Sequence, residues 1–122
     1  MRRDHGYIPE LGRTGVQRAC IELLEWHKVP YFRMNAGNQI IMENGKRRRM
    51  RGHPAGTADL LAAPNQNGIL PLWLWIECKS TEGEQTNIQR DFQLRMERHG
   101  HFYLIVRDVV VLEDWLRKHG AL

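Results

Sequence analysis

Long apolar runs are missing from this sequence of 122 residues, and none approaches the ~20 residues that a membrane-spanning helix needs. No apolar stretch follows the charged start of the chain, as it would in a secretory signal. Internal repeats and low-complexity segments are missing as well. We therefore expect a single domain, residues 1–122, that acts in the cytoplasm and has no membrane partner.

Cysteine is scarce in the chain. The two cysteines, Cys20 and Cys78, form no Cys-x-x-Cys pair, so neither indicates a zinc site or a redox motif. Both stand among apolar residues, which favours small buried side chains over reactive ones.

Positive charge is in moderate excess and is unevenly distributed along the chain. Hydrophobic residues make up 42% and charged residues 26%, so a packed core is feasible. The formal net charge is +4, and residues 46–51 concentrate five cations: Lys46, Arg47, Arg48, Arg49 and Arg51. Such a cluster suits a polyanion, because each phosphate that it neutralises releases counterions. A solvated loop without a partner has the same composition, so charge alone leaves nucleic-acid binding open.

Helical periodicity occurs in three segments. Residues 14–27 place apolar side chains on one side, with Thr14 as the expected N-cap. Residues 86–98 have Thr86 as the expected N-cap and end before Gly100, a helix terminator. On this second helix a set of apolar residues is spaced to face a core: Ile88, Phe92 and Met96. Residues 110–118 are expected to form the last helix.

Strand patterns occur between the helices, at residues 31–34, 57–62, 69–79 and 101–107. Segment 69–79 is apolar on both faces, which indicates a central strand. Its Trp73 and Trp75, like Trp115, are expected in the core. The order of elements predicts a mixed α/β domain around one sheet.

Two segments are expected to stand apart from this domain core. Residues 1–12 contain glycine and proline and are expected to form an N-terminal arm. Asn44-Gly45 is a strong signal for a two-residue hairpin turn between residues 39–42 and 47–51. We expect a basic hairpin, residues 39–52, whose returning arm carries the cationic cluster.

The residues with the clearest chemical potential lie around the expected central strand. Glu77 and Lys79 are two apart, so on a strand they project from the same face. An antiparallel neighbour can bring Asp59 beside Glu77. Two adjacent carboxylates repel each other unless a cation lies between them, and a divalent ion with oxygen ligands is the natural solution. A strand end that regains solvent with a weak salt bridge is the alternative interpretation.

Further groups can complete such a site. The backbone carbonyl of Cys78 is a candidate metal ligand. Lys79 could orient a water molecule or stabilise charge that develops on a phosphate. Gln89, one turn into the second helix, could hold that water or a phosphate, although exposed glutamines are common on helices. These parts suit hydrolysis of a phosphodiester.

The same residues carry a resemblance to a known family. The stretches that carry it are Gly56-Thr57-Ala58-Asp59, Ile76-Glu77-Cys78-Lys79, and Thr86-Asn87-Ile88-Gln89 with the helix up to Gly100. Together they resemble the VRR-NUC domain of the PD-(D/E)XK nuclease superfamily, whose pattern is G-x-x-D, E-x-K and an S-x-x-Q helix. Thr86 replaces the serine and keeps its hydroxyl. Residues 16–20 and 33–37 are also similar, so the resemblance spans residues 16–110.

The resemblance implies a fold and an activity. The fold would be α/β, with a restriction-endonuclease-like αβββαβ core and a mixed central sheet flanked by helices. The activity would be that of a Mg²⁺- or Mn²⁺-dependent DNA endonuclease, a hydrolase of phage or bacterial host cells that forms a homodimer and serves DNA repair. Branched or flapped DNA would be its substrate.

The resemblance also implies roles for single residues. Asp59 and Glu77 would bind metal, Lys79 would be catalytic, and Gln89 would support the site. The family carries a glutamate at the start of the first helix. The aligned position here is near Arg13 or Thr14, neither of which is acidic, so Glu10 of the arm is the candidate substitute as a metal ligand. The residues expected to contact DNA are Arg33, Asn35, Lys46, Arg47, Arg48, Arg49, Arg51 and His53.

Two other functions are compatible with the sequence. A module of the same fold could bind DNA without cutting it, as the missing acid and the basic cluster allow. A structural protein could use the tryptophan-rich strand as an interface, although a charged pair and a basic hairpin are not what an apolar interface needs.

Overall fold

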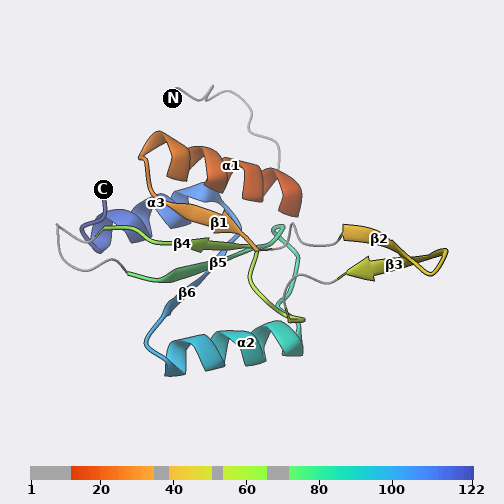
Figure 1. The fold of residues 1–122 in the computed structure, drawn as a ribbon. Coiled ribbons are helices and arrows are strands. Elements are labelled where there is room, and N and C mark those ends of the chain that lie inside the picture. The colour runs from red at the N-terminus through yellow and green to blue at the C-terminus, as the bar shows by residue number, and fades with distance from the viewer. Residues whose placement is uncertain (1–11, 35–38, 51–53, 66–71) are drawn as a thin grey trace.

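The computed structural model describes residues 12–34, 39–50, 54–65 and 72–122, of which 39–43 and 47–50 as backbone alone. Figure 1 shows the arrangement. The elements are, in chain order, α1 (Arg13–Trp26), β1 (Tyr31–Arg33), β2 (Gln39–Glu43), β3 (Lys46–Met50), β4 (Leu60–Ala62), β5 (Leu74–Cys78), α2 (Asn87–Arg98), β6 (Phe102–Val106) and α3 (Val109–Lys118).

Four strands form an open mixed sheet in the order β1-β4-β5-β6. β4 pairs antiparallel with both β1 and β5, whereas β5 and β6 run parallel and α2 provides the crossover between them. Every residue of β5 is buried, so the prediction of a central strand is confirmed. The mixed α/β class is confirmed too. The elements of the sheet and its first two helices follow the order αβββαβ, and their assignment to a restriction-endonuclease-like core stays a prediction.

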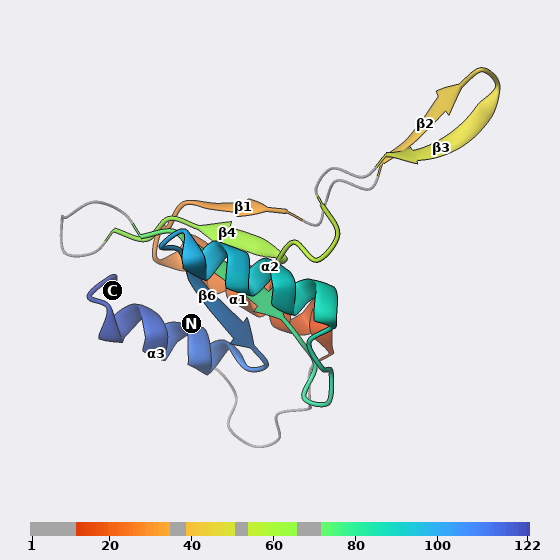
Figure 2. The same ribbon diagram turned by 90° about the horizontal axis from the view of Figure 1, so that it is seen from below.

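Helices cover both faces of the sheet (Figures 1 and 2). One face packs against α1 and α3 through a cluster that includes Val16, Leu24, Ile76 and Leu112. The opposite face packs against α2 through a smaller cluster, in which Trp75 and Phe92 meet edge to face with ring centroids 4.9 Å apart. The sheet is therefore the middle of three layers, and the end of β5 lies between two packed faces.

Local signals explain where α2 begins and ends. The Thr86 hydroxyl accepts a hydrogen bond from the Gln89 amide over 3.2 Å, and the Gln89 side chain accepts one from the Thr86 amide over 2.9 Å. This capping box confirms Thr86 as the N-cap. Gly100 follows the helix with φ +86°, a conformation that glycine adopts without steric cost.

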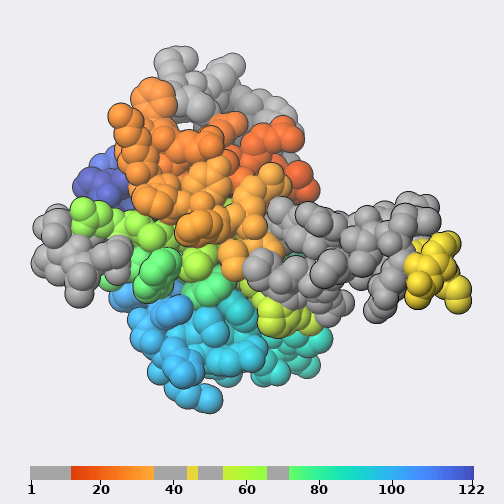
Figure 3. Space-filling view, viewed as in Figure 1, coloured from red at the N-terminus to blue at the C-terminus, as the bar shows by residue number. Residues whose placement is uncertain are grey.

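The predicted hairpin forms a separate two-stranded sheet from β2 and β3. Asn44 and Gly45 both have positive φ, 53° and 76°, as the tight turn of a hairpin requires. Figure 3 shows the tip, residues 44–46, standing away from the body of the molecule. The basic run therefore extends along a projection, as expected.

Several sequence-based boundaries were wrong. Gly12, rather than Thr14, is the N-cap of α1. The strand expected over 57–62 covers only Leu60–Ala62, so Asp59 lies in a bend directly before β4. Lys79 likewise lies just past the end of β5. The shorter strands still place both residues at one end of the sheet.

Two apolar residues expected in the core are exposed. Ile88 is 55% exposed and Trp73 is 43% exposed. Ile88 faces the turn at Gly56 rather than the sheet, and Trp73 lies just before β5 begins. Trp75, by contrast, is buried, and Trp115 packs against the core as predicted.

No helix among the described residues combines the length and the apolar character that a bilayer crossing demands. The expected N-terminal arm, residues 1–12, lies outside the described residues except for Gly12.

Candidate active site

The pairing of β4 with β5 brings two carboxylates together. Leu60 is paired with Ile76, so Asp59, directly before β4, lies next to Glu77 near the end of β5. Asp59 is 2% exposed and Glu77 is 1% exposed. The Asp59 Oδ2 atom accepts a hydrogen bond from the Cys78 amide over 2.8 Å, which fixes its position against β5. The predicted meeting of these two acids therefore occurs, although Asp59 lies in a bend and not within a strand.

Gln89 links Lys79 to Glu77 in the predicted site. Lys79 Nζ donates to Gln89 Oε1 over 2.7 Å, and Gln89 Nε2 donates to Glu77 Oε2 over 3.1 Å. Lys79 Nζ itself lies 3.8 Å from Glu77 Oε2. The capping box of α2 holds the Gln89 backbone, so the glutamine reaches the site from a fixed helix end. Glu77, Lys79 and Gln89 thus form one connected group, and Asp59 lies beside it as a neighbouring charge of Glu77.

Burial changes the acidity of Glu77. Removal from water raises its pKa to about 7, and the neighbouring charge of Asp59 adds to the rise. The cations of Lys79 and Arg13 lower the pKa in part. A carboxyl group that is half protonated near neutral pH is one that an additional cation would ionise.

The donor set fits a hard divalent ion. Glu77 Oε1 is enclosed and has no hydrogen-bond partner among the residues that the structure describes. An unpaired buried oxygen of this kind costs free energy that a bound cation would recover. Within the same residues no group of three or more His, Cys, Asp or Glu side chains is arranged so that it could hold a metal ion. Two carboxylates are nevertheless sufficient for Mg²⁺, which keeps water and takes substrate phosphate oxygens as its other ligands. The Cys78 carbonyl stays a predicted ligand.

Arg13 is a site residue whose contact the sequence did not predict. Its guanidinium donates a charged hydrogen bond to Asp59 Oδ1. The side chain of Arg13 is 48% exposed, so the contact joins a half-exposed cation to a buried acid.

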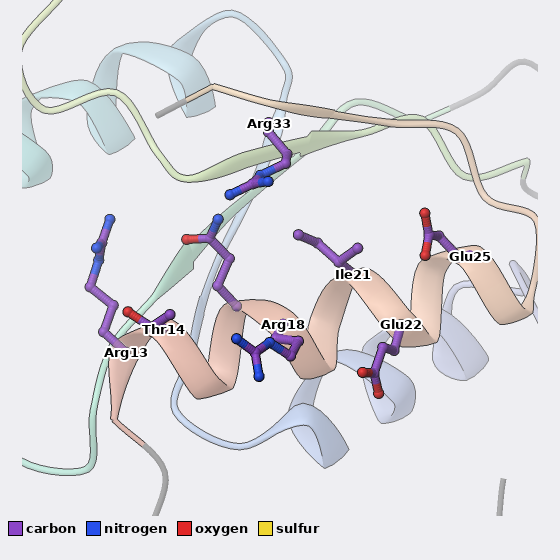
Figure 4. A pocket seen from close by; sticks show the side chains of 8 residues that line it. Arg13, Thr14, Arg18, Ile21, Glu22, Glu25 and Arg33 are labelled. Atoms are coloured by element: carbon purple, nitrogen blue, oxygen red, sulfur yellow. The ribbon is translucent and has the colours of Figure 1, made fainter. Parts of the chain in front are cut away.

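A hollow of about 560 Å³ runs along α1 from this contact, and we call it the α1 groove. The residues that line it are Arg13, Thr14, Gln17, Arg18, Ile21, Glu22, Glu25 and Arg33. Figure 4 shows Arg33 pointing across the groove toward α1, with Glu22 and Glu25 farther along the helix from Arg13. Gln17 is 7% exposed, a buried polar residue that helical periodicity alone did not single out.

Tyr103 is a second residue that was missed. It lies on β6, where it is paired with Trp75 of β5, and its hydroxyl accepts a hydrogen bond from Gln85 over 3.5 Å. Burial and the charge of Glu77 raise the pKa of Tyr103, so the phenol stays protonated beside the acid. The alternation of side chains along residues 101–107 could have placed Tyr103 on the face of Trp75 and Glu77.

The predicted DNA-contacting residues lie in different parts of the molecule, and some lie outside the described residues. Arg33 is exposed and lines the α1 groove, and Lys46 is exposed at the hairpin turn. The backbone of Arg47, Arg48 and Arg49 lies in β3. Four predicted site residues, Glu10, Asn35, Arg51 and His53, lie outside the described residues.

Cys20 and Cys78 are both buried and unpaired by any disulfide, as expected. A hydrogen bond with Cys20, together with burial, raises the pKa of the Cys78 thiol. The Cys78 thiol therefore packs in the core, while the Cys78 backbone amide holds Asp59 through a hydrogen bond.

Comparison of the chain with models of known protein families, with curated proteins and with solved structures found no match. The resemblance to the VRR-NUC domain therefore depends on the motifs in the sequence and stays a prediction.

Proposed function

We propose that this protein is a divalent-metal-dependent nuclease that hydrolyses the phosphodiester backbone of DNA. The observation that carries the proposal is the buried pair of Asp59 and Glu77, with one Glu77 oxygen lacking a hydrogen-bond partner among the described residues, beside the linked Lys79 and Gln89. Two acids, an amine and an amide at a single strand end match what metal-assisted hydrolysis requires.

Each residue has a distinct part in this proposal. Asp59 and Glu77 hold Mg²⁺ or Mn²⁺, and the chemistry supplied by that ion is polarisation of the scissile phosphate and a lowered pKa of bound water. Lys79 holds positive charge next to the phosphate oxygen that becomes more negative in the transition state. Gln89 keeps the Lys79 ammonium in place through its hydrogen bond to Nζ.

The polyanionic substrate is inferred from charge. The chain carries a net charge of +4, its β3 arm is almost entirely basic, and Arg13, Arg18 and Arg33 line the α1 groove next to the site. Cationic surfaces of this kind bind the phosphate backbone without regard to base sequence. Branched, flapped, nicked and linear DNA all remain candidate substrates under the proposal.

The test is cleavage of labelled branched, flapped, nicked and linear DNA with Mg²⁺ or Mn²⁺, with EDTA as the metal-free comparison. We expect cleavage that EDTA abolishes and that Asp59→Ala and Glu77→Ala reduce by at least about 1,000-fold. Asp114→Ala removes an exposed acid from α3 and is the matched control, with expected activity close to that of the unaltered protein. Failure to cut any form, or undiminished cutting by Glu77→Ala, would reject the proposal.

A non-catalytic DNA-binding module of the same fold is the second candidate. The contact between Arg13 and Asp59 favours it, because a guanidinium already neutralises one acid without any metal. This candidate predicts DNA binding that depends on salt, survives Glu77→Ala and produces no cleavage. Turnover that disappears on Glu77→Ala excludes it.

We also propose that the protein acts as a homodimer, because one small domain offers little surface for two DNA arms. Multi-angle light scattering at low micromolar concentration measures this directly. Twice the mass of one chain is expected, and a mass equal to one chain would contradict the dimer.

A further inference from the structure

The ion pair of Arg13 and Asp59 joins a half-exposed cation at the start of α1 to a buried acid of the candidate site. Asp59 is buried, its Oδ2 is held by the Cys78 amide, and its Oδ1 is held by the guanidinium of Arg13. Arg13 is the first residue of α1 and reaches Asp59 from 46 positions away in the sequence. The cation therefore occupies an oxygen that a divalent ion would need.

Charge balance decides which cation gives way to a metal. With Arg13 and Lys79 in place, two positive charges face the two carboxylates of Asp59 and Glu77. A divalent ion added to that group would leave an excess of positive charge in a mostly buried site, which is unfavourable. Lys79 is 9% exposed and bonded to Gln89, whereas the Arg13 side chain is 48% exposed and has a long flexible stem. Arg13 is the cation that can leave at the lower cost.

The α1 groove offers Arg13 a second position. Arg13 lines the groove together with Arg18 and Arg33. Farther along α1 from Arg13 the groove is lined by the acids Glu22 and Glu25, so the part near the arginines is the part that suits an anion. A guanidinium can bind a phosphate through two parallel N–H donors, and three arginines around one hollow fit a phosphodiester strand.

We propose that Arg13 is an exchangeable cation, which pairs with Asp59 in the metal-free protein and turns into the α1 groove to bind a substrate phosphate when a divalent ion occupies Asp59 and Glu77. This inference rests on the proposed function. It makes Arg13 a residue that competes with metal before substrate arrives and recognises substrate once metal is bound.

Metal affinity gives the first test. Isothermal titration of the DNA-free protein with Mn²⁺ compares the unaltered chain with Arg13→Gln and with Arg18→Gln. The second variant removes an equal charge from the same groove and controls for the general electrostatic field. We expect Arg13→Gln to bind Mn²⁺ three- to tenfold more tightly, and Arg18→Gln to change the affinity by less than twofold. Equal or weaker binding by Arg13→Gln would overturn the exchange.

DNA affinity gives the second test. Each arginine variant, with Lys79 left in place, is mixed with a fluorescent 20-base-pair duplex, and the anisotropy reached before any strand is cut is recorded by stopped flow with Mn²⁺ and with EDTA. Arg13→Gln should weaken binding three- to tenfold with Mn²⁺ and less than twofold with EDTA, because in EDTA Arg13 is held by Asp59. Arg18→Gln should weaken binding equally in both. An equal effect of Arg13→Gln in both conditions contradicts the proposal.

The outcomes separate this inference from the proposed function. If the unaltered protein binds Mn²⁺ and cuts DNA but Arg13→Gln has unchanged Mn²⁺ affinity, the exchange alone is wrong. If the unaltered protein neither binds Mn²⁺ nor cuts DNA, both are wrong. Circular dichroism and urea unfolding of Arg13→Gln verify that this change at the helix end leaves the fold intact.

Discussion

Gln89 donates a hydrogen bond through Nε2 to Oε2 of Glu77 over 3.1 Å and so ties the first turn of α2 to the end of β5. Its carbonyl oxygen accepts from Lys79 Nζ and from the Thr86 amide. One side chain therefore completes a helix cap and positions two members of the candidate site. The two roles can be separated by mutation, because Thr86 contributes to the cap alone.

The first prediction concerns Gln89→Ala. Loss of its contacts frees the Lys79 ammonium, and misplacement of a catalytic group by about 1 Å typically costs about 100-fold in rate. We therefore expect single-turnover cleavage to fall about 100-fold, with about 1 kcal/mol of stability lost from the capping box. Rapid-quench assays and urea unfolding measure the two effects.

Thr86→Ala is the control for this prediction. It removes the hydroxyl that accepts from the Gln89 amide, so a similar loss of stability is expected. Cleavage should stay within about threefold of the unaltered protein, since the Gln89 side chain keeps its partners. Equal loss of cleavage in both variants would show that Gln89 acts only as a helix cap.

The second prediction concerns pH and Glu77. Because the folded-state pKa of about 7 lies above the ordinary 4.5, the folded protein retains a proton that the unfolded chain has lost. This contribution leaves stability highest below pH 4.5, lowers it as pH rises from 4.5 to 7, and stays constant above that. A pKa difference of one between the folded and unfolded states corresponds to about 1.4 kcal/mol, so the loss of stability would be at most about 3 kcal/mol. Glu77→Gln cannot ionise and should not show it.

Urea unfolding in EDTA at pH 5 and pH 8 measures this effect. The stability of the unaltered protein relative to Glu77→Gln should fall between the two pH values. Asp114→Asn removes an exposed acid and should show no such change in relative stability. A difference between Glu77→Gln and the unaltered protein that is the same at both pH values would mean that Glu77 is not held neutral by burial.

Much of this arrangement could be predicted from local sequence signals. Thr86 and Gly100 mark the ends of α2 because a hydroxyl cap and a positive φ are local requirements. The continuous apolar run before Glu77 predicted a strand buried on both faces. Adjacent antiparallel strands then brought Asp59 close to Glu77, since pairing of neighbouring strands is the most common arrangement.

Other features depend on contacts that no local pattern encodes. Ile88 has the spacing of a core residue but covers the Gly56 turn. Because Gly56 has no side chain, Ile88 can pack directly on the backbone there. Asp59 lies in a bend rather than in the expected strand. Its side chain accepts a hydrogen bond from the Cys78 amide, while its carbonyl accepts one from the Met34 amide over 2.8 Å. The contact of Arg13 with Asp59 joins residues 46 positions apart, so only the fold reveals it.

The third prediction concerns the turn before Asp59. A Cβ at Gly56 would lie 2.6 Å from both the Cγ2 and the carbonyl oxygen of Ile88, and φ there is +85°. Gly56→Ala therefore combines a strained backbone conformation, about 1–2 kcal/mol, with overpacking of about 1–3 kcal/mol. We expect a loss of about 3 kcal/mol in urea unfolding and reduced cleavage, because the turn positions Asp59.

Gly100→Ala isolates the backbone part of that loss. Gly100 has φ +86°, but no atom lies within 4 Å of the position that an alanine Cβ would take, so only the conformational strain applies. Its expected cost is about 1–2 kcal/mol, with cleavage unaffected. Equal destabilisation by the two substitutions would argue against close packing of the Gly56 turn on Ile88.

The fourth prediction concerns the basic hairpin. β2 and β3 form a sheet of their own, so charge can be removed there without altering the core. Each lost phosphate contact lowers the slope of log affinity against log salt concentration by about 0.9, so replacing Arg47, Arg48 and Arg49 with Gln should lower it by up to about 2.7. Removing three exposed cations elsewhere, Arg95, Arg98 and Lys118, should lower the slope by less than about 1. Anisotropy titrations of one duplex in EDTA at several salt concentrations measure both.

Cleavage at saturating DNA should persist in the hairpin variant, because the substituted arginines lie outside the candidate active site around Asp59 and Glu77. If the two triple variants lose equal slope, the hairpin is not the main DNA-binding surface, and if the hairpin variant fails to cut at saturation, the projection contributes to the chemistry as well as to binding.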